Sequence, residues 1–299
     1  MKRRFLHYTS LILSITGLIS CQGKSQLPAA PDNKSLLWEV SGNNLQKPAY
    51  IFGTMHLLCA SDAALSDNLK NVITASDTIY FEVDMDDLAQ LLGGFTAGKM
   101  KHDTTLSDLY TPEEYTRVKT FFDAHRMGAM LQMFGTMQPM LISALVYQAA
   151  LPCTEADGME MNIMKLAHSE KKEIKGLETV AFQASVLESI PYTKQAKELL
   201  NSIDSLDATK KETDEMLKLY KEQDVEKLLD YSLKSEGGTT SDVQEVMIDN
   251  RNRNWIAQFP EITKDKQILI AVGAGHLGGK AGLLQLLREK GYTIRAIKN

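Results

Sequence analysis

The stretches AYIFGTMHL (residues 49–57) and ILIAVGAGHL (268–277) decide the fold of this chain. Each begins as a short apolar run typical of a buried strand, and each run ends at a glycine that permits a sharp turn. A histidine follows three residues after that glycine. The two glycine and histidine pairs are Gly53 with His56 and Gly273 with His276.

Each stretch opens a longer unit of the same order. The glycine-terminated strand is followed by a segment of helical pattern and by another strand, over residues 51–83 and again over 268–297. The sequence therefore predicts an α/β fold with a central mixed sheet built from two strand-Gly-x-x-His-helix-strand units. Duplication and coincidence both remain open as the origin of the repeat, but histidines in equivalent places indicate one shared site.

The other elements follow from periodicity and turn signals. The turn-rich segment SGNNLQKP (41–48) predicts a hairpin between strands at 36–40 and 49–53. No Pro/Gly/Ser-rich linker divides the chain, so we predict one domain over 36–299 with a large helical insertion at about 112–257. The further predicted elements are helices at 61–76 and 279–290 and strands at 78–83, 173–175, 267–272 and 292–297.

The first 20 residues have the composition of an export signal, with three basic residues before a mostly apolar run and no acid. Ser20 before Cys21 resembles the lipobox of bacterial lipoproteins, in which the cysteine carries a lipid. A plain signal peptide and an uncleaved anchor are the alternatives. We expect residues 1–20 to be removed, residues 21–35 to form a flexible tether, and the lipid on Cys21 to hold the chain on a membrane of the bacterial cell envelope, facing the periplasm or another extracytoplasmic space.

The charge of the chain argues against nucleic-acid binding. Residues 1–20 contain three bases and no acid, so their removal changes the net charge from -5 to -8. A surface with this excess of acidic groups repels a phosphate backbone.

The cysteines point to a disulfide. If Cys21 is lipidated, only Cys59 and Cys153 remain, in a compartment where disulfides persist. We therefore predict a bond between Cys59 and Cys153; two buried thiols are the alternative.

Two histidines and one glutamate form a candidate metal site. His56 and His276 both follow strands, and ligands of α/β sheets bind at the carboxyl ends of the strands. Glu82 lies in the apolar strand TIYFEV, where an unpaired charge is costly. Two imidazoles and a carboxylate suit a divalent metal; histidines that only form hydrogen bonds in their loops are the alternative. The remaining histidines of the mature chain are expected at the surface, namely His102, His125 and His168.

The combination of motifs resembles the TraB/GumN family, also called the TraB/PrgY/GumN or Tiki-like superfamily, over about residues 36–298. Each motif is common by chance, and the order and spacing make the set specific. The segments that carry the resemblance are the two Gly-x-x-His motifs, FEVD at 81–84, GLET at 176–179, RNRNW at 251–255 and the closing helix at 278–287.

The resemblance implies a fold similar to the haem-binding ChaN-like and the erythromycin-esterase-like proteins, and for the Tiki branch a metal-dependent peptidase. It points to His56, Glu82 and His276 as the central residues. The supporting residues that it implies are Glu178, Arg251, Asn252, Gly53 and Gly273. Glu160 is a secondary candidate, because many relatives would have Asp at that position.

The mechanism that we expect is hydrolysis of a peptide or related carbonyl compound. A divalent ion such as Mn, Co or Zn, held by His56, His276 and a carboxylate, would activate water, and a second glutamate, Glu82 or Glu178, would act as general base. Arg251 would stabilise the oxyanion or grip a substrate carboxylate. The alternative is a non-catalytic module that binds a peptide, haem or another small ligand.

Familiar enzyme motifs are absent from the sequence. There is no HExxH, no Gly-x-Ser-x-Gly and no phosphate-binding loop. The pattern Gly-x-Gly-x-x-Gly at 273–278 formally matches a dinucleotide-binding turn, but the strand after it ends the chain without an acidic residue for the ribose. These absences argue against the common zinc peptidases, serine hydrolases, NTPases and nucleotide-dependent enzymes.

Overall fold

The computed structural model describes residues 27–234 and 240–299. The predicted export signal, Cys21 and the first part of the predicted tether lie outside these residues. No helix within the described ranges is long and apolar enough to cross a bilayer.

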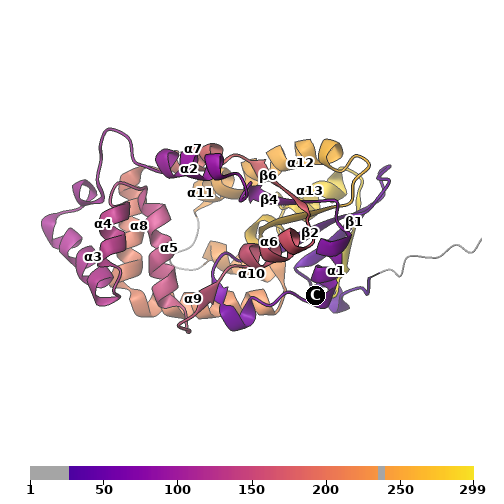
Figure 1. Cartoon of the computed structure of the whole chain (residues 1–299). Helices are drawn as coiled ribbons and strands as arrows, with labels where there is room; N and C mark the ends of the chain where they lie inside the picture. The colour runs from indigo at the N-terminus through magenta and orange to yellow at the C-terminus, as the bar shows by residue number, and fades with distance from the viewer. Residues whose placement is uncertain (1–26, 235–239) are drawn as a thin grey trace, which may run out of the picture.

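A six-stranded mixed sheet forms one end of the molecule (Figure 1). Its order is β6-β4-β7-β2-β1-β8, and β6, β4, β7 and β2 run parallel to one another, whereas β1 is antiparallel to both neighbours. The strands are β1 (Leu37–Ser41), β2 (Ala49–Thr54), β4 (Thr78–Val83), β6 (Glu173–Glu178), β7 (Ile268–Gly273) and β8 (Thr293–Ile297). The α/β fold with a mixed central sheet is therefore confirmed.

The two histidine-bearing units meet in the middle of the sheet. Strands β2 and β7 are direct parallel neighbours, paired from Tyr50 with Leu269 to Thr54 with Gly273. Both strands are buried along almost their whole length, as expected for apolar strands covered on two faces. The loops that follow them consequently leave the same edge of the sheet.

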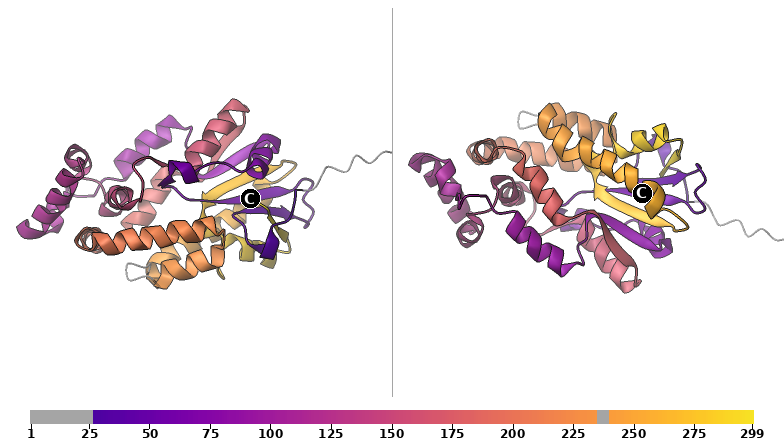
Figure 2. Two further views of the ribbon diagram at one scale, coloured as in Figure 1. Left: turned by 90° about the horizontal axis from the view of Figure 1, so that it is seen from below. Right: turned by 90° about the horizontal axis from the view of Figure 1, so that it is seen from above.

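Helices cover the sheet and form a separate lobe at the other end of the molecule (Figures 1 and 2). The helices around the sheet are α1 (Asp67–Ala75), α6 (Met159–Ser169), α10 (Val225–Lys234), α12 (Asn250–Ile262) and α13 (Leu283–Glu289). The helices that lead to the lobe or build it are α2 (Leu88–Ala97), α3 (Pro112–Ala124), α4 (Gly128–Phe134), α5 (Pro139–Ala150), α7 (Val180–Glu188), α8 (Tyr192–Asp204), α9 (Leu206–Lys221) and α11 (Ser241–Gln244).

The lobe has a hydrophobic core of its own. Phe122 of α3, Ile142 and Val146 of α5 and Leu199 of α8 are fully buried there and pack together. A core that is separate from that of the sheet explains why this long, mostly helical insertion keeps a defined shape.

Several predicted boundaries differ from the observed ones. The helix predicted at 61–76 begins only at Asp67, because the Ser66 hydroxyl accepts the Leu69 N–H as an N-cap. The helix predicted at 279–290 begins at Leu283, since Gly279 has a φ of 81°, which no helix allows. The strand predicted at 173–175 extends to Glu178.

Residues 27–35, which the sequence places in a flexible tether, lie along β8. The Ala30 N–H donates to the Ala296 carbonyl, and the Ser35 hydroxyl donates to the carbonyl of Ile297. Lys34 forms an ion pair with Asp224 at 3.0 Å. Within the described residues, 27–35 therefore pack against the domain rather than forming a flexible tether.

Candidate functional site

The site lies at the carboxyl edge of the parallel strands, where helix α12 crosses them. Its centre is Arg251, which is 3% exposed and lies one residue after the start of α12. Glu82 comes from β4, Glu178 from the end of β6, and His276 from the short 3-10 turn η5 (Ala274–His276) after β7. The structure thus gathers residues that are as many as 194 positions apart in the chain around one guanidinium.

Every N–H group of the Arg251 guanidinium has an acceptor. Nη2 donates to Glu82 Oε2 and Glu178 Oε1, both at 2.6 Å, and Nε donates to Glu178 Oε1 at 2.9 Å. Nη1 donates to the Met247 carbonyl at 2.8 Å and to His276 Nε2 at 3.2 Å. A guanidinium has five N–H groups, so Arg251 keeps none for a substrate oxyanion or carboxylate in this arrangement.

A π-helical turn contributes one of these acceptors. Residues Glu245–Asp249 form a π turn between α11 and α12, and Met247 lies within it. π turns inside helices are rare and occur often at functional sites. This turn directs the Met247 carbonyl toward the side chain of Arg251. No pattern in the sequence predicts this contact.

Glu82 is a buried, ionised carboxylate. Burial disfavours its charge, but nearby His276, Arg251 and His56 and the Gly273 N–H favour it, and the pKa of Glu82 falls below its ordinary value. Its Oε1 accepts the Gly273 N–H at 2.9 Å, and its Oε2 also accepts Gln183 Nε2 at 3.0 Å. The buried negative charge of Glu82 on β4 is therefore stabilised by hydrogen bonds to both of its oxygens.

Glu178 anchors Arg251 from the neighbouring strand. Besides its two bonds from Arg251, it accepts the Trp255 Nε1–H on Oε2 at 3.1 Å. Burial raises the pKa of Glu178, and the bonds from Arg251 and Trp255 oppose that rise. Since both carboxylate oxygens are engaged, Glu178 holds the network together.

The tautomer of His276 is fixed by Asn252. Asn252 Nδ2 donates to the carbonyls of His276 and Ala281, so its Oδ1 must be the atom that faces His276 Nδ1 at 2.7 Å. Nδ1 therefore carries the proton, and Nε2 presents its lone pair to Arg251 Nη1 and lies 3.6 Å from Glu82 Oε1. Asn252 therefore orients the ring of His276.

Two residues of the site were missed by the sequence reasoning. Trp255 packs its ring 4.5 Å from that of His276 and 4.8 Å from the Arg251 guanidinium, in addition to its bond to Glu178. Gln183 of α7 bridges the two carboxylates, Glu82 at 3.0 Å and Glu178 at 3.4 Å. Trp255 belongs to a quoted motif, so a role could have been assigned; nothing in the sequence distinguishes Gln183 from a surface glutamine.

His56 is paired with Glu160 and lies close enough to Glu82 and Arg251 for their charges to affect its pKa. Its side chain is 71% exposed, and its Nδ1 lies 2.7 Å from the buried Oε1 of Glu160. The hydrogen bond with Glu160 and the negative charges of Glu160 and Glu82 raise the pKa of His56. Glu160 therefore reaches the site, although it has one methylene more than the expected aspartate.

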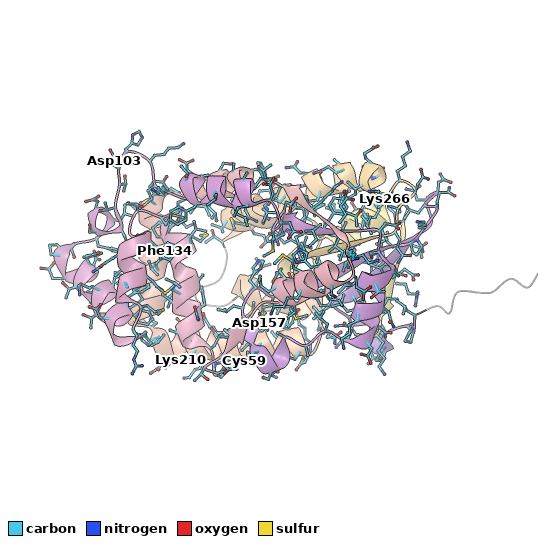
Figure 3. The ribbon with its side chains drawn as sticks, in the orientation of Figure 1. Cys59, Asp103, Phe134, Asp157, Lys210 and Lys266 are labelled. Atoms are coloured by element: carbon cyan, nitrogen blue, oxygen red, sulfur yellow. A yellow bond between two sulfur atoms is a disulfide. The ribbon has the colours of Figure 1, made fainter. Side chains whose placement is uncertain are left out.

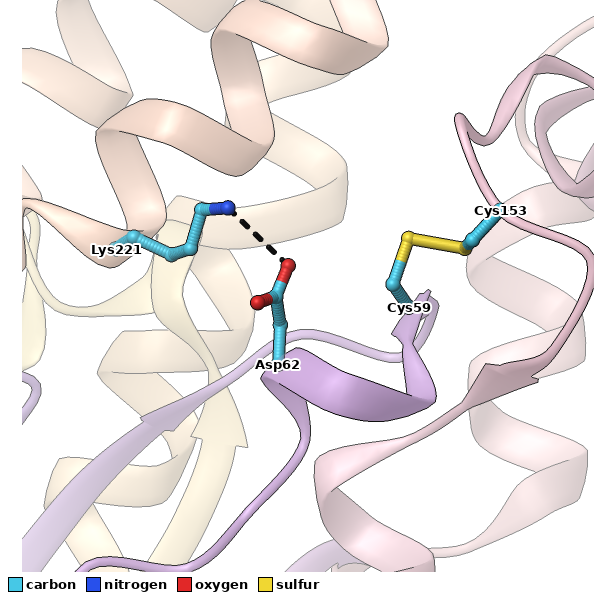
Figure 4. Close-up of a disulfide and its surroundings, with 4 residues drawn as sticks. All are labelled: Cys59, Asp62, Cys153 and Lys221. Carbon is cyan, nitrogen blue, oxygen red and sulfur yellow. Dashed lines mark hydrogen bonds and ion pairs between the residues drawn. A yellow bond between two sulfur atoms is a disulfide. The ribbon is translucent and has the colours of Figure 1, made fainter.

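A short ladder and a disulfide hold this pair in place. Strand β3 (Leu58–Cys59) follows His56 and pairs with β5 (Ala156–Asp157), which precedes Glu160. Cys59 and Asp157 of this ladder lie between the lobe and the sheet (Figure 3). The predicted bond between Cys59 and Cys153 is confirmed (Figure 4).

The two motif glycines are required by close approach. A Cβ on Gly53 would lie 3.1 Å from the Cα of Ala274 in the neighbouring loop, and a Cβ on Gly273 would lie 3.3 Å from Glu82 Oε1. A side chain at Gly53 would displace the loop at Ala274, and one at Gly273 would displace the carboxylate of Glu82, by a few tenths of an ångström in each case.

The donor atoms suit a divalent metal in kind. His56 and His276 each have Nδ1 next to an oxygen, of Glu160 and Asn252 respectively, which is the usual partner of a metal-ligating histidine and leaves Nε2 for the ion. Glu82 adds a charged oxygen. Within residues 27–234 and 240–299, however, no three His, Cys, Asp or Glu side chains are grouped closely enough to hold a metal. Arg251 lies among these donors instead.

The burial of neutral His276 predicts a pH-dependent stability. Burial lowers its pKa from 6.5 to about 4, against the opposing charge of Glu82. Between pH 6.5 and about 4, His276 is protonated in the unfolded chain and neutral in the folded chain. The free energy of unfolding therefore falls as the pH falls through this range. We expect a loss on the order of 3 kcal/mol from this group, and His276→Gln should remove it.

Urea unfolding of wild type and variant from pH 7 to pH 4 measures this loss. His168→Gln is the matched control, because His168 is half exposed and pairs with Asp86 at the surface. An identical pH slope for wild type and His276→Gln would contradict the assignment.

One of the comparisons with known proteins gave a match. The model of the TraB/PrgY/gumN family matches residues 36–296, nearly the whole chain. Neither the curated proteins nor the solved structures gave a match. The chain belongs to the TraB/PrgY/gumN family.

Proposed function

We propose that this chain is a metal-dependent hydrolase that cleaves a peptide or a related acyl bond. The observation that carries the proposal is that two imidazoles each have an oxygen at Nδ1, and that one of them, His276, lies next to the ionised buried carboxylate of Glu82. His56, His276 and Glu82 would hold the ion. A bound divalent ion supplies an activated water and polarises the scissile carbonyl.

The chain's own residues then have distinct roles. Glu178 and Arg251 are positioning residues, since Glu178 holds the guanidinium and the guanidinium keeps Glu82 charged. Glu160 is a positioning residue as well, because its contact with His56 Nδ1 orients the ring and leaves Nε2 for the ion. Its Oε1 is buried and receives no well-aligned hydrogen bond from the described residues, although His56 Nδ1 lies 2.7 Å away. Glu82 and Glu178, in contrast, have donors on both oxygens.

The proposal includes export and lipid attachment through Cys21. Its support is the signal-like sequence of residues 1–20 and the Cys59–Cys153 disulfide, which is typical of compartments outside the cytosol. The cell envelope is the proposed location, with a peptide or small molecule as ligand.

Peptide digestion tests the catalytic role. The purified chain is incubated with a peptide mixture and Mn²⁺, Co²⁺ or Zn²⁺, with and without chelator, and mass spectrometry records new termini. We expect cleavage that the chelator abolishes and that His56→Ala and His276→Ala each reduce by more than about 100-fold. His168→Ala is the control and should retain full activity.

A non-catalytic binding module is the second candidate. It is favoured by the engagement of every Arg251 N–H and by the lack of a three-residue metal cluster in the described parts of the chain. Peptides that bind but stay intact with every metal would support the module and contradict the hydrolase.

A further inference from the structure

Three side-chain acceptor atoms lie close to the guanidinium of Arg251, in addition to the Met247 carbonyl. Glu82 Oε2 and Glu178 Oε1 lie 2.6 Å from Nη2, and His276 Nε2 lies 3.2 Å from Nη1. Glu82 and His276 are also two of the three residues that we propose as metal ligands. Glu82 and His276 therefore accept hydrogen bonds from the Arg251 cation and, in the proposed function, would also bind a divalent ion.

Two cations cannot share these groups without a cost. The side chains of Arg251 and His276 are each only 4% exposed, so water screens little of the repulsion between a guanidinium and an ion placed beside it. The lone pair of His276 Nε2 also points at Arg251 Nη1 and must be released before it can bind a metal.

We propose that Arg251 is a built-in competitor of the metal, and that Glu178 strengthens the competition by anchoring the guanidinium away from solvent. The inference rests on the proposed metal-dependent function. It assigns Glu178 the opposite effect to Glu82: Glu82 attracts the metal, whereas Glu178 holds the residue that excludes it.

The contacts of Glu178 support the role of an anchor. Its Oε1 accepts hydrogen bonds from Nε and Nη2 of Arg251, and its Oε2 accepts a hydrogen bond from Trp255 Nε1. It has no contact with His276 or His56 among the interactions of the described residues, so its loss should free Arg251 without removing a proposed ligand.

Calorimetric titration of the chelator-treated full chain with Mn²⁺ and with Zn²⁺ tests the proposal. Glu178→Gln is the main variant, because it keeps the shape of the side chain and removes its charge. Arg251→Gln is the second variant, and thermal unfolding with and without metal records whether it folds. Arg253→Gln is the matched control, since Arg253 lies on the same helix and pairs with exposed Glu245 at 2.9 Å.

We expect Glu178→Gln to bind metal about 10- to 100-fold more tightly than wild type, the equivalent of one hydrogen bond to a charged group. Arg251→Gln should bind more tightly as well and should gain thermal stability from the metal, Arg253→Gln should match wild type, and Glu82→Gln should lose binding.

The results separate the inference from the proposed function. Wild type that binds metal while Glu178→Gln and Arg251→Gln bind no more tightly overturns the inference and leaves the proposed function intact. Binding by these two variants but not by wild type supports the inference and contradicts the metal-dependent function. No binding by any form overturns both.

Discussion

Replacement of Arg251 by methionine is expected to lower the free energy of unfolding by about 3 to 5 kcal/mol. The guanidinium is the partner of two buried carboxylates, and its removal leaves Glu82 and Glu178 charged inside the protein. The Met247 carbonyl and His276 Nε2 lose their donor at the same time. Urea unfolding at pH 7, followed by circular dichroism, measures the change.

Two comparisons isolate the cause. Arg253→Met removes an exposed arginine from the same helix and should cost less than about 1 kcal/mol. Adding Glu82→Gln and Glu178→Gln to Arg251→Met should restore part of the lost stability, because no unpaired buried charge then remains. The assignment is wrong if Arg251→Met costs no more than Arg253→Met.

The strands of the central sheet were predictable because most of their residues are apolar. The strand predicted at 78–83 has the bounds of β4 (Thr78–Val83), and the strand predicted at 49–53 begins, as β2 does, at Ala49. Helix ends were less predictable, since they depend on single hydrogen bonds and dihedral angles. The Ser66 cap and the positive φ of Gly279 are examples.

The residues of the site were predictable, and the contacts between them were not. Sequence order and resemblance single out His56, Glu82, Glu178, Arg251 and His276. They do not show that Arg251 uses all of its donors internally, because this depends on the π turn before α12 and on side chains placed by three strands, β4, β6 and β7. Arg251, expected to meet the substrate, is therefore the buried centre of the network.

The His56 side of the site depends on contacts distant in sequence. Glu160 approaches His56 only because β3 pairs with β5, and two-residue strands carry no hydrophobic pattern from which pairing could be inferred. The predicted disulfide between Cys59 and Cys153 was the one signal in the sequence that the chain around β3 lies next to the chain around β5.

Loss of the Cys59–Cys153 bond is expected to lower the free energy of unfolding by about 4 kcal/mol. The bond joins residues 94 positions apart, and closing a loop of that size removes about 4 to 5 kcal/mol of entropy from the unfolded chain. Urea unfolding of the Cys59→Ser/Cys153→Ser variant measures the loss. Wild type in reductant should behave like the variant, and the variant should not respond to reductant.

The nearby ion pair between Asp62 and Lys221 provides the matched control for this disulfide (Figure 4). It lies on the turn after β3 but is partly exposed, so Asp62→Asn should cost less than about 1 kcal/mol. Since β3 directly follows the loop of His56 and β5 directly precedes helix α6 with Glu160, the disulfide variant should lose the contact between these two residues before the sheet unfolds. Hydrogen exchange should therefore speed up first at β3 and β5, and equal protection of both strands in the variant and wild type would show that the disulfide adds stability without positioning the site.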